Sequence, residues 1–236
     1  MRILGIDSSG LVASVAVADE EQMIAEYTVN YKKTHSQTLL PMLDEIVKMV
    51  ELDLGSIDAI AVAAGPGSFT GLRIGSATAK GLGLALGKPV ISVPTMEGIA
   101  YNMWGTDALV VPLMDARRSQ VYTGIYEFCD GQLHQIEGQM AVPVAELIGR
   151  VNGYGRKTVF LGDGAAVFRQ MLEASVTVPF SFAPSHMNRQ RAASVAALAF
   201  VYAAQGKTES AAEHRPDYLK LSQAERERAQ KDADSL

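Results

Sequence analysis

Carboxylates and hydroxyls follow two apolar segments of the chain at corresponding positions. Asp7 ends the apolar segment 2–7 and precedes two serines, whereas Asp115 directly follows the apolar segment 109–114. Aspartates at strand ends can hold a divalent cation together with the phosphates of a nucleotide. A glycine turn at 162–164 enters a predicted helix, where backbone N–H groups can bind an anion. The candidates for nucleotide binding are Asp7, Ser8, Ser9, Asp115, Gly162, Asp163 and Gly164. The alternative is that the segments after Asp7, after Asp115 and at 162–164 are ordinary turns at strand ends.

The remaining chemistry-bearing residues do not assemble a catalytic centre in the sequence. No two of the histidines are four residues apart, and none has a second ligand at metal spacing. The segment Gly67-Ser68-Phe69-Thr70-Gly71 lacks the pattern of a nucleophile elbow. No Lys-Ser or Lys-Thr pair follows these glycines at the spacing of a P-loop. We therefore predict no catalytic residues and no metal ligands.

The segment 65–87 combines a glycine-rich turn with a helix that carries small residues at every fourth position. A proline between two glycines directly follows the apolar segment 59–64, which is typical of the end of a buried strand. Ser68 and Thr70 are both suitable helix N-caps. Each glycine inside a helix costs about 1 kcal/mol relative to alanine. We interpret the small residues as a surface that a helix outside this chain approaches closely: Gly71, Gly75, Ala79, Gly83 and Gly87.

The predicted helix 36–52 is apolar over more of its circumference than a single buried stripe requires. One face of this helix can pack on a sheet, so the surplus apolar residues need a second surface. That surface belongs either to the same domain or to a second protein chain, and the sequence leaves both alternatives open.

Composition limits the classes of function. Of the 236 residues, 48% are apolar and 20% are charged, which is enough apolar material for a sizeable core. The net charge of −5 and the scattered basic residues argue against nucleic-acid binding by this chain alone. A single cysteine excludes an internal disulfide, and neither a signal peptide nor a run of about 18 apolar residues is found. We therefore expect a cytoplasmic protein without membrane contact.

Apolar periodicity and turn residues predict an α/β chain in which one order of elements occurs twice. Each half contains three strands, a helix, a strand, a helix, a strand and a helix. The predicted strands are 2–7, 11–18, 22–29, 58–64, 89–93, 109–114, 120–128, 132–137, 158–161 and 176–178. The predicted helices are 36–52, 71–86, 95–104, 143–150, 165–174 and 189–205. Strands joined first by hairpins and then by helical crossovers form a mixed sheet, so we expect two lobes with a cleft between them.

The domain boundaries follow from this duplication. We expect the N-terminal lobe to comprise residues 1–105 and the smaller C-terminal lobe to comprise residues 106–188. The long helix 189–205 is a candidate to pack back on the N-terminal lobe. Residues 207–236 form a polar and charged tail.

Several motifs resemble the TsaB (YeaZ) family, which acts in bacterial tRNA threonylcarbamoyladenosine (t6A) synthesis, and together they cover nearly the whole chain. They are Ile6-Asp7-Ser8-Ser9, His35-Ser36-Gln37-Thr38-Leu39-Leu40-Pro41, the segment from Gly65 to Gly75, Met114-Asp115-Ala116-Arg117 and Gly162-Asp163-Gly164. The resemblance implies a two-lobed actin-like ATPase fold (ASKHA, ribonuclease H-like) with duplicated βββαβαβα topology. That topology agrees with the order of the predicted elements.

The resemblance implies a non-catalytic subunit that binds the catalytic subunit TsaD and helps to recruit the ATPase TsaE. The complex modifies adenosine 37 of tRNA, which this chain would contact only through the complex. TsaD-like proteins carry two metal-binding histidines where this chain has Thr95 and Ile99, so both ligands are absent. No cofactor of its own is implied, beyond ATP or ADP with Mg²⁺ at the junction with the partners. Members of the family form homodimers when the partner is missing.

The pairing surface implied by the family is a helix bundle, made by the first two helices of the N-terminal lobe. The implied interface residues are Ser36, Leu39, Leu40, Leu43, Ile46, Val47, Leu72, Ile74, Gly75, Thr78 and Gly81. Two alternatives remain. One is an enzyme in its own right, either a nucleotide phosphohydrolase or a glycoprotease-like metallopeptidase. The other is a regulator of further protein partners that acts independently of tRNA.

Overall fold

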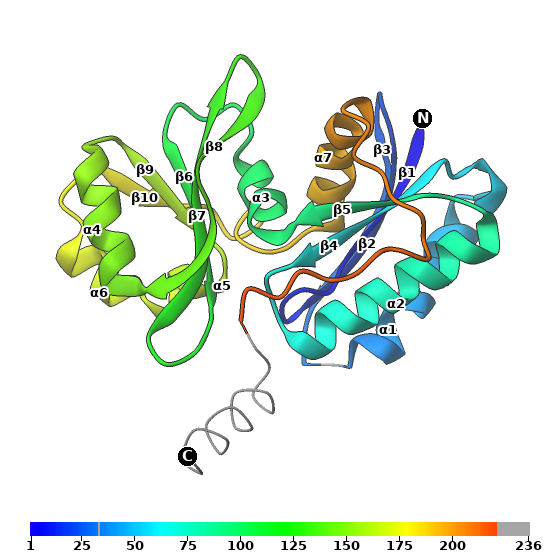
Figure 1. Cartoon of the computed structure of the whole chain (residues 1–236), viewed down its shortest axis with the longest axis horizontal. Helices are drawn as coiled ribbons and strands as arrows, with labels where there is room; N and C mark the ends of the chain where they lie inside the picture. Colours follow the sequence, from blue (N-terminus) through cyan, green and yellow to red (C-terminus); the bar gives the residue numbers. More distant parts are fainter. Residues whose placement is uncertain (33, 221–236) are drawn as a thin grey trace, which may run out of the picture.

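The computed structural model describes residues 1–32 and 34–220, which form two lobes side by side (Figure 1). Each lobe is built around a five-stranded sheet. Among the described residues, no helix combines the length and apolar character needed to cross a lipid bilayer.

The first sheet has the spatial order β3-β2-β1-β4-β5. Its strands are β1 (Arg2–Asp7), β2 (Val12–Asp19), β3 (Met23–Asn30), β4 (Ala59–Gly65) and β5 (Val90–Pro94). β1 pairs antiparallel with β2 and parallel with β4. Ile3 and Leu4 are both fully buried but belong to different core clusters, because successive side chains of a strand point to opposite faces. Both faces of this sheet are therefore covered.

The second sheet repeats this arrangement, in the order β10-β9-β6-β7-β8. Its strands are β6 (Leu109–Asp115), β7 (Gln120–Cys129), β8 (Gln132–Pro143), β9 (Thr158–Leu161) and β10 (Phe180–Phe182). β6 pairs antiparallel with β7 and parallel with β9, as β1 does with β2 and β4. The predicted duplication of element order is therefore confirmed.

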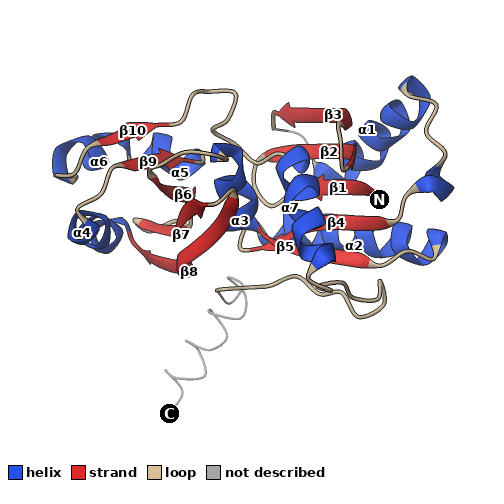
Figure 2. Cartoon of the chain, turned by 90° about the horizontal axis from the view of Figure 1, so that it is seen from above, coloured by secondary structure: helices blue, strands red, loops and turns tan. Residues whose placement is uncertain are grey.

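The helices tie the two lobes together. α1 (His35–Met49) and α2 (Phe69–Leu86) cover one face of the first sheet, and α7 (Ala192–Ala204) covers the other (Figure 2). α3 (Thr95–Ala100) follows the first sheet in sequence but also contacts β6 and β7 of the second. The second lobe carries α4 (Val144–Tyr154), α5 (Asp163–Val167) and α6 (Arg169–Ser175), and short 3-10 turns lie at Leu54–Ser56 and Tyr101–Met103.

Two segments of the second lobe differ from the prediction. In the described chain, residues 176–178 are not a strand, and β10 lies four residues later, where the backbone pairs with β9. Val176 and Val178 instead pack on the core of the second lobe, so apolar alternation placed this strand too early. The expected helix 165–174 is divided into α5 and α6, because Phe168 leaves the helical conformation (φ −101°, ψ 14°).

α1 has a buried face and exposed apolar residues on both flanks of that face. Leu39, Leu43 and Ile46 belong to the core of the first lobe. Leu40 and Met49 lie on the two flanks and keep 54% and 81% of their surface exposed. The alternative of a helix buried on two sides within its own domain is therefore wrong.

The small residues of α2 face the chain's own first lobe. A Cβ added at Gly71 would lie 2.1 Å from the carbonyl oxygen of Ser8, and one at Gly75 would lie 2.4 Å from the Ser8 hydroxyl. A Cβ added at Gly83 would lie 2.7 Å from Ala211. The interpretation of these glycines as a surface for a helix outside the chain is therefore corrected: they allow α2 to approach the loop after β1 and the C-terminal segment.

The described part of the predicted polar tail, residues 207–220, lies along the first lobe and reaches the second (Figure 1). Glu209 pairs with Val90 at the edge of β5 through two backbone hydrogen bonds. His214 is buried, and its Nδ1 lies 2.9 Å from both Ser92 Oγ and Glu209 Oε1. The expected solvated end of the tail, from Glu225 onward, lies outside the described residues.

The packing of α2 predicts opposite effects for two glycine-to-alanine substitutions in one helix. Gly75→Ala should lower the free energy of unfolding by about 1–3 kcal/mol, because its Cβ would overlap the Ser8 hydroxyl. Gly81→Ala is the matched control: no atom lies within 4 Å of its added Cβ, so helix propensity should stabilise the protein by up to about 1 kcal/mol. Urea unfolding of both variants measures the difference. Equal effects would contradict the intramolecular role of Gly75.

Candidate functional site

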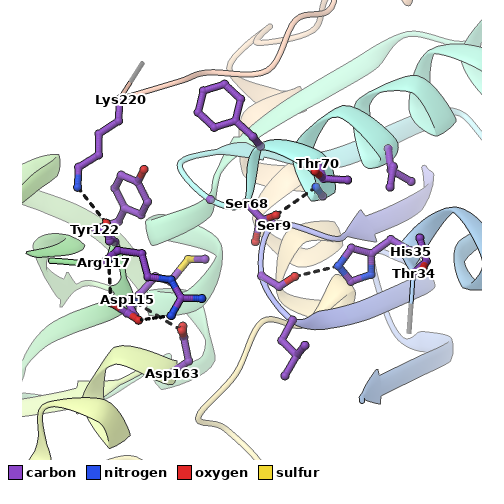
Figure 3. Close-up of a pocket in the computed structure, with 18 residues that line it drawn as sticks. Ser9, Thr34, His35, Ser68, Thr70, Asp115, Arg117, Tyr122, Asp163 and Lys220 are labelled. Atoms are coloured by element: carbon purple, nitrogen blue, oxygen red, sulfur yellow. Dashed lines mark hydrogen bonds and ion pairs between the residues drawn. The ribbon is translucent and has the colours of Figure 1, made fainter. Parts of the chain in front are cut away.

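A cavity of about 530 Å³ lies between the lobes and is lined by residues from both (Figure 3). Its first-lobe wall comes from the loop after β1, the start of α1 and the N-terminal turn of α2. Its second-lobe wall comes from the end of β6, the following loop and the start of α5. The polar and charged lining residues are Ser9, Thr34, His35, Ser68, Thr70, Asp115, Arg117, Tyr122, Asp163 and Lys220. The expected cleft is therefore present, at the carboxyl ends of β1 and β6.

The first aspartate is withdrawn from this cavity. Asp7 is buried, and its Oδ1 accepts hydrogen bonds from the backbone N–H of Ser9 (2.9 Å) and the Ser9 hydroxyl (2.7 Å). Burial raises the pKa of Asp7 from 3.8 to about 6, against the opposing effect of these hydrogen bonds and of His35. Ser8 is also buried, and its hydroxyl donates to the carbonyl of Gly71. Of the first three candidates, only Ser9 lines the cavity, whereas Asp7 and Ser8 shape its wall.

The other two candidate aspartates, Asp115 and Asp163, do line the cavity. Asp115 Oδ1 accepts a hydrogen bond from the backbone N–H of Arg117 at 2.8 Å, and Asp163 Oδ2 accepts one from the N–H of Asp115 at 3.4 Å. Burial raises the pKa of Asp163. Asp163 Oδ1 is buried without a hydrogen-bond partner among the described residues. Asp115 Oδ2 already pairs with the Arg117 guanidinium at 3.3 Å. The unsatisfied Asp163 oxygen beside it suits a cation or a hydrogen-bond donor from a ligand.

The glycine turn before α5 serves packing. A Cβ at Gly162 would lie 2.1 Å from the carbonyl oxygen of Leu113, and one at Gly164 would lie 3.0 Å from the same residue. Gly162 also has a φ of 96°, which favours glycine. Its N–H donates to Asn188 Oδ1 at 2.6 Å, so the interpretation of Gly162 as an anion donor is corrected. Gly162 and Gly164 let α5 approach β6 and thereby place Asp163 at the cavity.

Several lining residues were absent from the predicted site. His35 Nε2 lies 2.9 Å from the Gly10 carbonyl, which ties the start of α1 to the loop after β1. Ser68 accepts a hydrogen bond from the Gly71 N–H as the N-cap of α2. Lys220 Nζ donates to the Ala116 carbonyl (3.1 Å) and to Gln120 Oε1 (2.6 Å). The capping signal of Ser68 was visible in the sequence, whereas Lys220 gave no local signal.

Thr95 and Ile99, which the resemblance aligned with the metal-binding histidines of TsaD-like proteins, are core residues. Thr95 is fully buried, and its hydroxyl accepts a hydrogen bond from the Gly65 N–H at 3.2 Å. Ile99 is buried in the cluster that joins α3 to the second lobe. Within the described residues, no group of three or more His, Cys, Asp or Glu side chains could hold a metal ion. Neither position offers a metal ligand.

The comparisons with known proteins agree with this architecture. A family model described as "TsaD: tRNA N6-adenosine threonylcarbamoyltransferase" matches residues 22–228. The Bacillus subtilis (strain 168) "tRNA threonylcarbamoyladenosine biosynthesis protein TsaB" is 34% identical over 228 residues, which cover 95% of this chain and 96% of that protein. The chain belongs to the TsaB (YeaZ) family. The Escherichia coli (strain K12) TsaB is also 34% identical, over 150 residues that cover 63% of this chain and 64% of that protein.

Solved structures of the TsaB (YeaZ) family share the fold. YeaZ from Pseudomonas aeruginosa superimposes with a TM-score of 0.76 at 26% identity, and the match covers 92% of this chain and 99% of that structure. A second Pseudomonas aeruginosa structure, described as similar to peptidase YEAZ, gives a TM-score of 0.78 at the same identity, covering 93% and 99%. The expected two-lobed α/β fold with its duplicated sheet topology is confirmed.

The residues of the predicted partner interface divide into two groups. Leu39, Leu43, Ile46, Leu72 and Gly75 are buried within the first lobe. Their assignment to the outer surface is therefore corrected. Ser36, Leu40 and Gly81 are exposed, and Val47, Ile74 and Thr78 are half-buried on the same pair of helices. The outer faces of α1 and α2 are thus the part of the prediction that a partner can reach.

The buried Asp7 carboxyl predicts an unusual dependence of stability on pH. Its pKa is higher in the folded protein, near 6, than the ordinary 3.8, so the folded state binds more protons between these values. The free energy of unfolding should therefore fall as pH rises from about 4 to about 6, by up to about 3 kcal/mol. Asp7→Asn keeps an oxygen acceptor for Ser9 but cannot ionise, and it should flatten this part of the curve.

Urea unfolding from about pH 4 to about pH 7 measures this slope. Asp44→Asn is the matched control, because Asp44 lies exposed on α1 and pairs only with Lys48 among the described residues. It should keep the wild-type slope. An Asp7→Asn protein with an unchanged slope would show that another group causes the pH dependence.

Proposed function

We propose that this chain is a non-catalytic subunit of tRNA threonylcarbamoyladenosine synthesis that binds TsaD and helps to recruit TsaE. Membership of the TsaB (YeaZ) family supports the role in t6A biosynthesis. The observation that carries the partner role is the apolar surface outside the first lobe. Leu40 and Met49 on α1 and Leu84 on the neighbouring α2 are all more than half exposed, and large apolar side chains left exposed on neighbouring helices suit contact with another protein.

The partner proposal places the chemistry in TsaD. In this proposal Thr95 and Ile99, both buried, take the positions of the metal-binding histidines that the resemblance implies for TsaD-like proteins. The metallopeptidase alternative would need those ligands. A phosphohydrolase would need a positioned nucleophile and base, and Asp7, the first candidate, already accepts both hydrogen bonds from Ser9. In this proposal the chain acts in the cytoplasm, meets tRNA only through the complex, and pairs with a second copy through the same helices when TsaD is missing.

A nucleotide with Mg²⁺ in the interlobe cavity is a second part of the proposal. Asp115 and Asp163 supply two neighbouring carboxylates, and the Asp163 Oδ1 lacks a hydrogen-bond partner among the described residues. Ser9, Ser68 and Thr70 supply hydroxyls on the facing wall. The cavity of about 530 Å³ has the size of known ligand pockets. These residues fit ATP or ADP with Mg²⁺, with Asp115 and Asp163 toward the cation.

Substitution of one exposed leucine tests the partner surface. Leu40→Asp should weaken binding to TsaD at least about tenfold, because a charge at the centre of an apolar interface loses its water without gaining a partner. The monomer should stay folded, since Leu40 is already half exposed. Native mass spectrometry of the chain mixed with TsaD, with and without TsaE, measures pairing and recruitment.

Val167→Asp is the matched control. Val167 is 60% exposed on α5 of the second lobe, outside the pair of helices that forms the proposed surface. This variant should bind TsaD like the wild type, and it should restore t6A in a strain depleted of its own TsaB. Undiminished pairing of the Leu40→Asp protein would refute the proposed surface.

A further inference from the structure

The aromatic ring of Phe69 is stacked by a residue of the C-terminal segment. Tyr218 lies parallel to it, with ring centroids 4.4 Å apart and an angle of 2° between the ring planes. Arg73, one turn later on α2, places its guanidinium carbon 5.5 Å from the Phe69 centroid and 5.9 Å from that of Tyr218. Its Nε donates a hydrogen bond to the Tyr218 hydroxyl at 3.2 Å. The Tyr218 ring is thus held by stacking on Phe69 and by a hydrogen bond from Arg73 to its hydroxyl.

This arrangement lies at the rim of the interlobe cavity. Phe69 itself lines the cavity, beside Ser68 and Thr70 in the first turn of α2. Lys220, two residues after Tyr218, lines the same cavity from the other lobe (Figure 3). A planar group on Phe69 therefore stands next to hydroxyls and charges that can bind a sugar and its phosphates.

We propose that Phe69 and Arg73 form a stacking platform for a nucleobase, and that Tyr218 occupies this platform in the present structure. The proposal rests on the proposed nucleotide in the cavity and assigns the place of its base. Proteins bind nucleobases by stacking on aromatic rings and by arginine beside the stack, because every base has a π-face. A ring nitrogen or carbonyl of a base would accept from Arg73 Nε, as the Tyr218 hydroxyl does here.

A competing ring can replace the contacts of the Tyr218 side chain itself, which are the stack on Phe69 and the hydrogen bond from Arg73. The segment is also held at the preceding residue. The backbone N–H of Asp217 donates to the Ala64 carbonyl, and its carboxylate accepts from Gln139 Nε2 at 3.0 Å. Tyr218 keeps 37% of its surface exposed, so this ring can leave without opening a core. A base that takes its place would loosen the segment that ends at Lys220 on the second lobe. Ligand binding and docking of the C-terminal segment are therefore coupled.

Calorimetric titration of AMP into the full-length chain tests the platform. Tyr218→Ala should raise the affinity for AMP about tenfold over the wild type, because it removes the competing ring. Leu219→Ala is the matched control: Leu219 is exposed to a similar extent and should leave the affinity unchanged. Adding Phe69→Leu to Tyr218→Ala should reverse the gain about tenfold, since leucine keeps apolar bulk but offers no stacking face.

Two further probes identify the source and the part of the ligand that is bound. Ribose 5-phosphate has no base, so its affinity should not respond to Phe69→Leu. A short single-stranded adenosine oligonucleotide distinguishes an RNA base from a free nucleotide: a larger gain for the oligonucleotide than for AMP in Tyr218→Ala assigns the platform to RNA, and an equal or smaller gain assigns it to the mononucleotide.

Equal AMP affinity of the wild type and Tyr218→Ala, or an unchanged affinity after Phe69→Leu, would overturn the platform. Absence of binding by every probe to every variant would also overturn it, together with the proposed nucleotide. Native mass spectrometry of the same variants with TsaD separates the platform from the proposed partner role. If the substitutions leave the AMP affinity unchanged while TsaD pairing is intact, the platform is rejected and the partner role is not.

Discussion

The close approach of α2 to the loop after β1 is the contact on which the interlobe region depends. The Ser8 hydroxyl donates to the Gly71 carbonyl, and the Ser68 N–H donates to the Ser9 carbonyl. These bonds form only because Gly71 and Gly75 carry no side chain toward Ser8. The glycines cost helix propensity, and the packing that they allow offsets this cost. This contact fixes where Phe69 meets the cavity and which face of α2 remains outside.

The topology could be predicted from the sequence because its signals are local. Apolar runs that end in aspartate or glycine marked β1, β4 and β6, and the duplicated order of elements followed from them. The partner of the small residues on α2 could not be predicted in the same way. A small residue at every fourth position shows that something approaches closely, but the spacing is identical for a contact within the chain and for one between chains. Only the fold identifies Ser8 as the neighbour.

The cavity residues that follow strand ends could also be predicted from the sequence, whereas those placed by contacts distant in the chain could not. Ser9, Asp115 and Asp163 were predicted because each follows the end of a strand, and these ends were expected to face the cleft between the lobes. The exclusion of Asp7 depends on a turn that directs its carboxylate to Ser9, and the sequence Asp-Ser-Ser does not reveal this direction. Tyr218 and Lys220 lie in a polar segment without periodicity. Their positions result from backbone pairing at Val90 and Ala64, more than 100 residues earlier in the chain.

The two lobes share one topology, and α3 joins them because it contacts strands of both sheets. α3 contacts β6 and β7 of the second sheet, whereas α7 packs on the first sheet. Thr95 and Ile99 on α3 are therefore buried where the two lobes meet. Histidines there would be buried beside the cluster of Ile99, Val110 and Met114, where an unsatisfied ring nitrogen is costly. Leu40 on α1 and Leu84 on α2 remain exposed on the outside of the first lobe. The closed joint between the lobes therefore leaves the outer sides of α1 and α2 as a surface that a partner can reach.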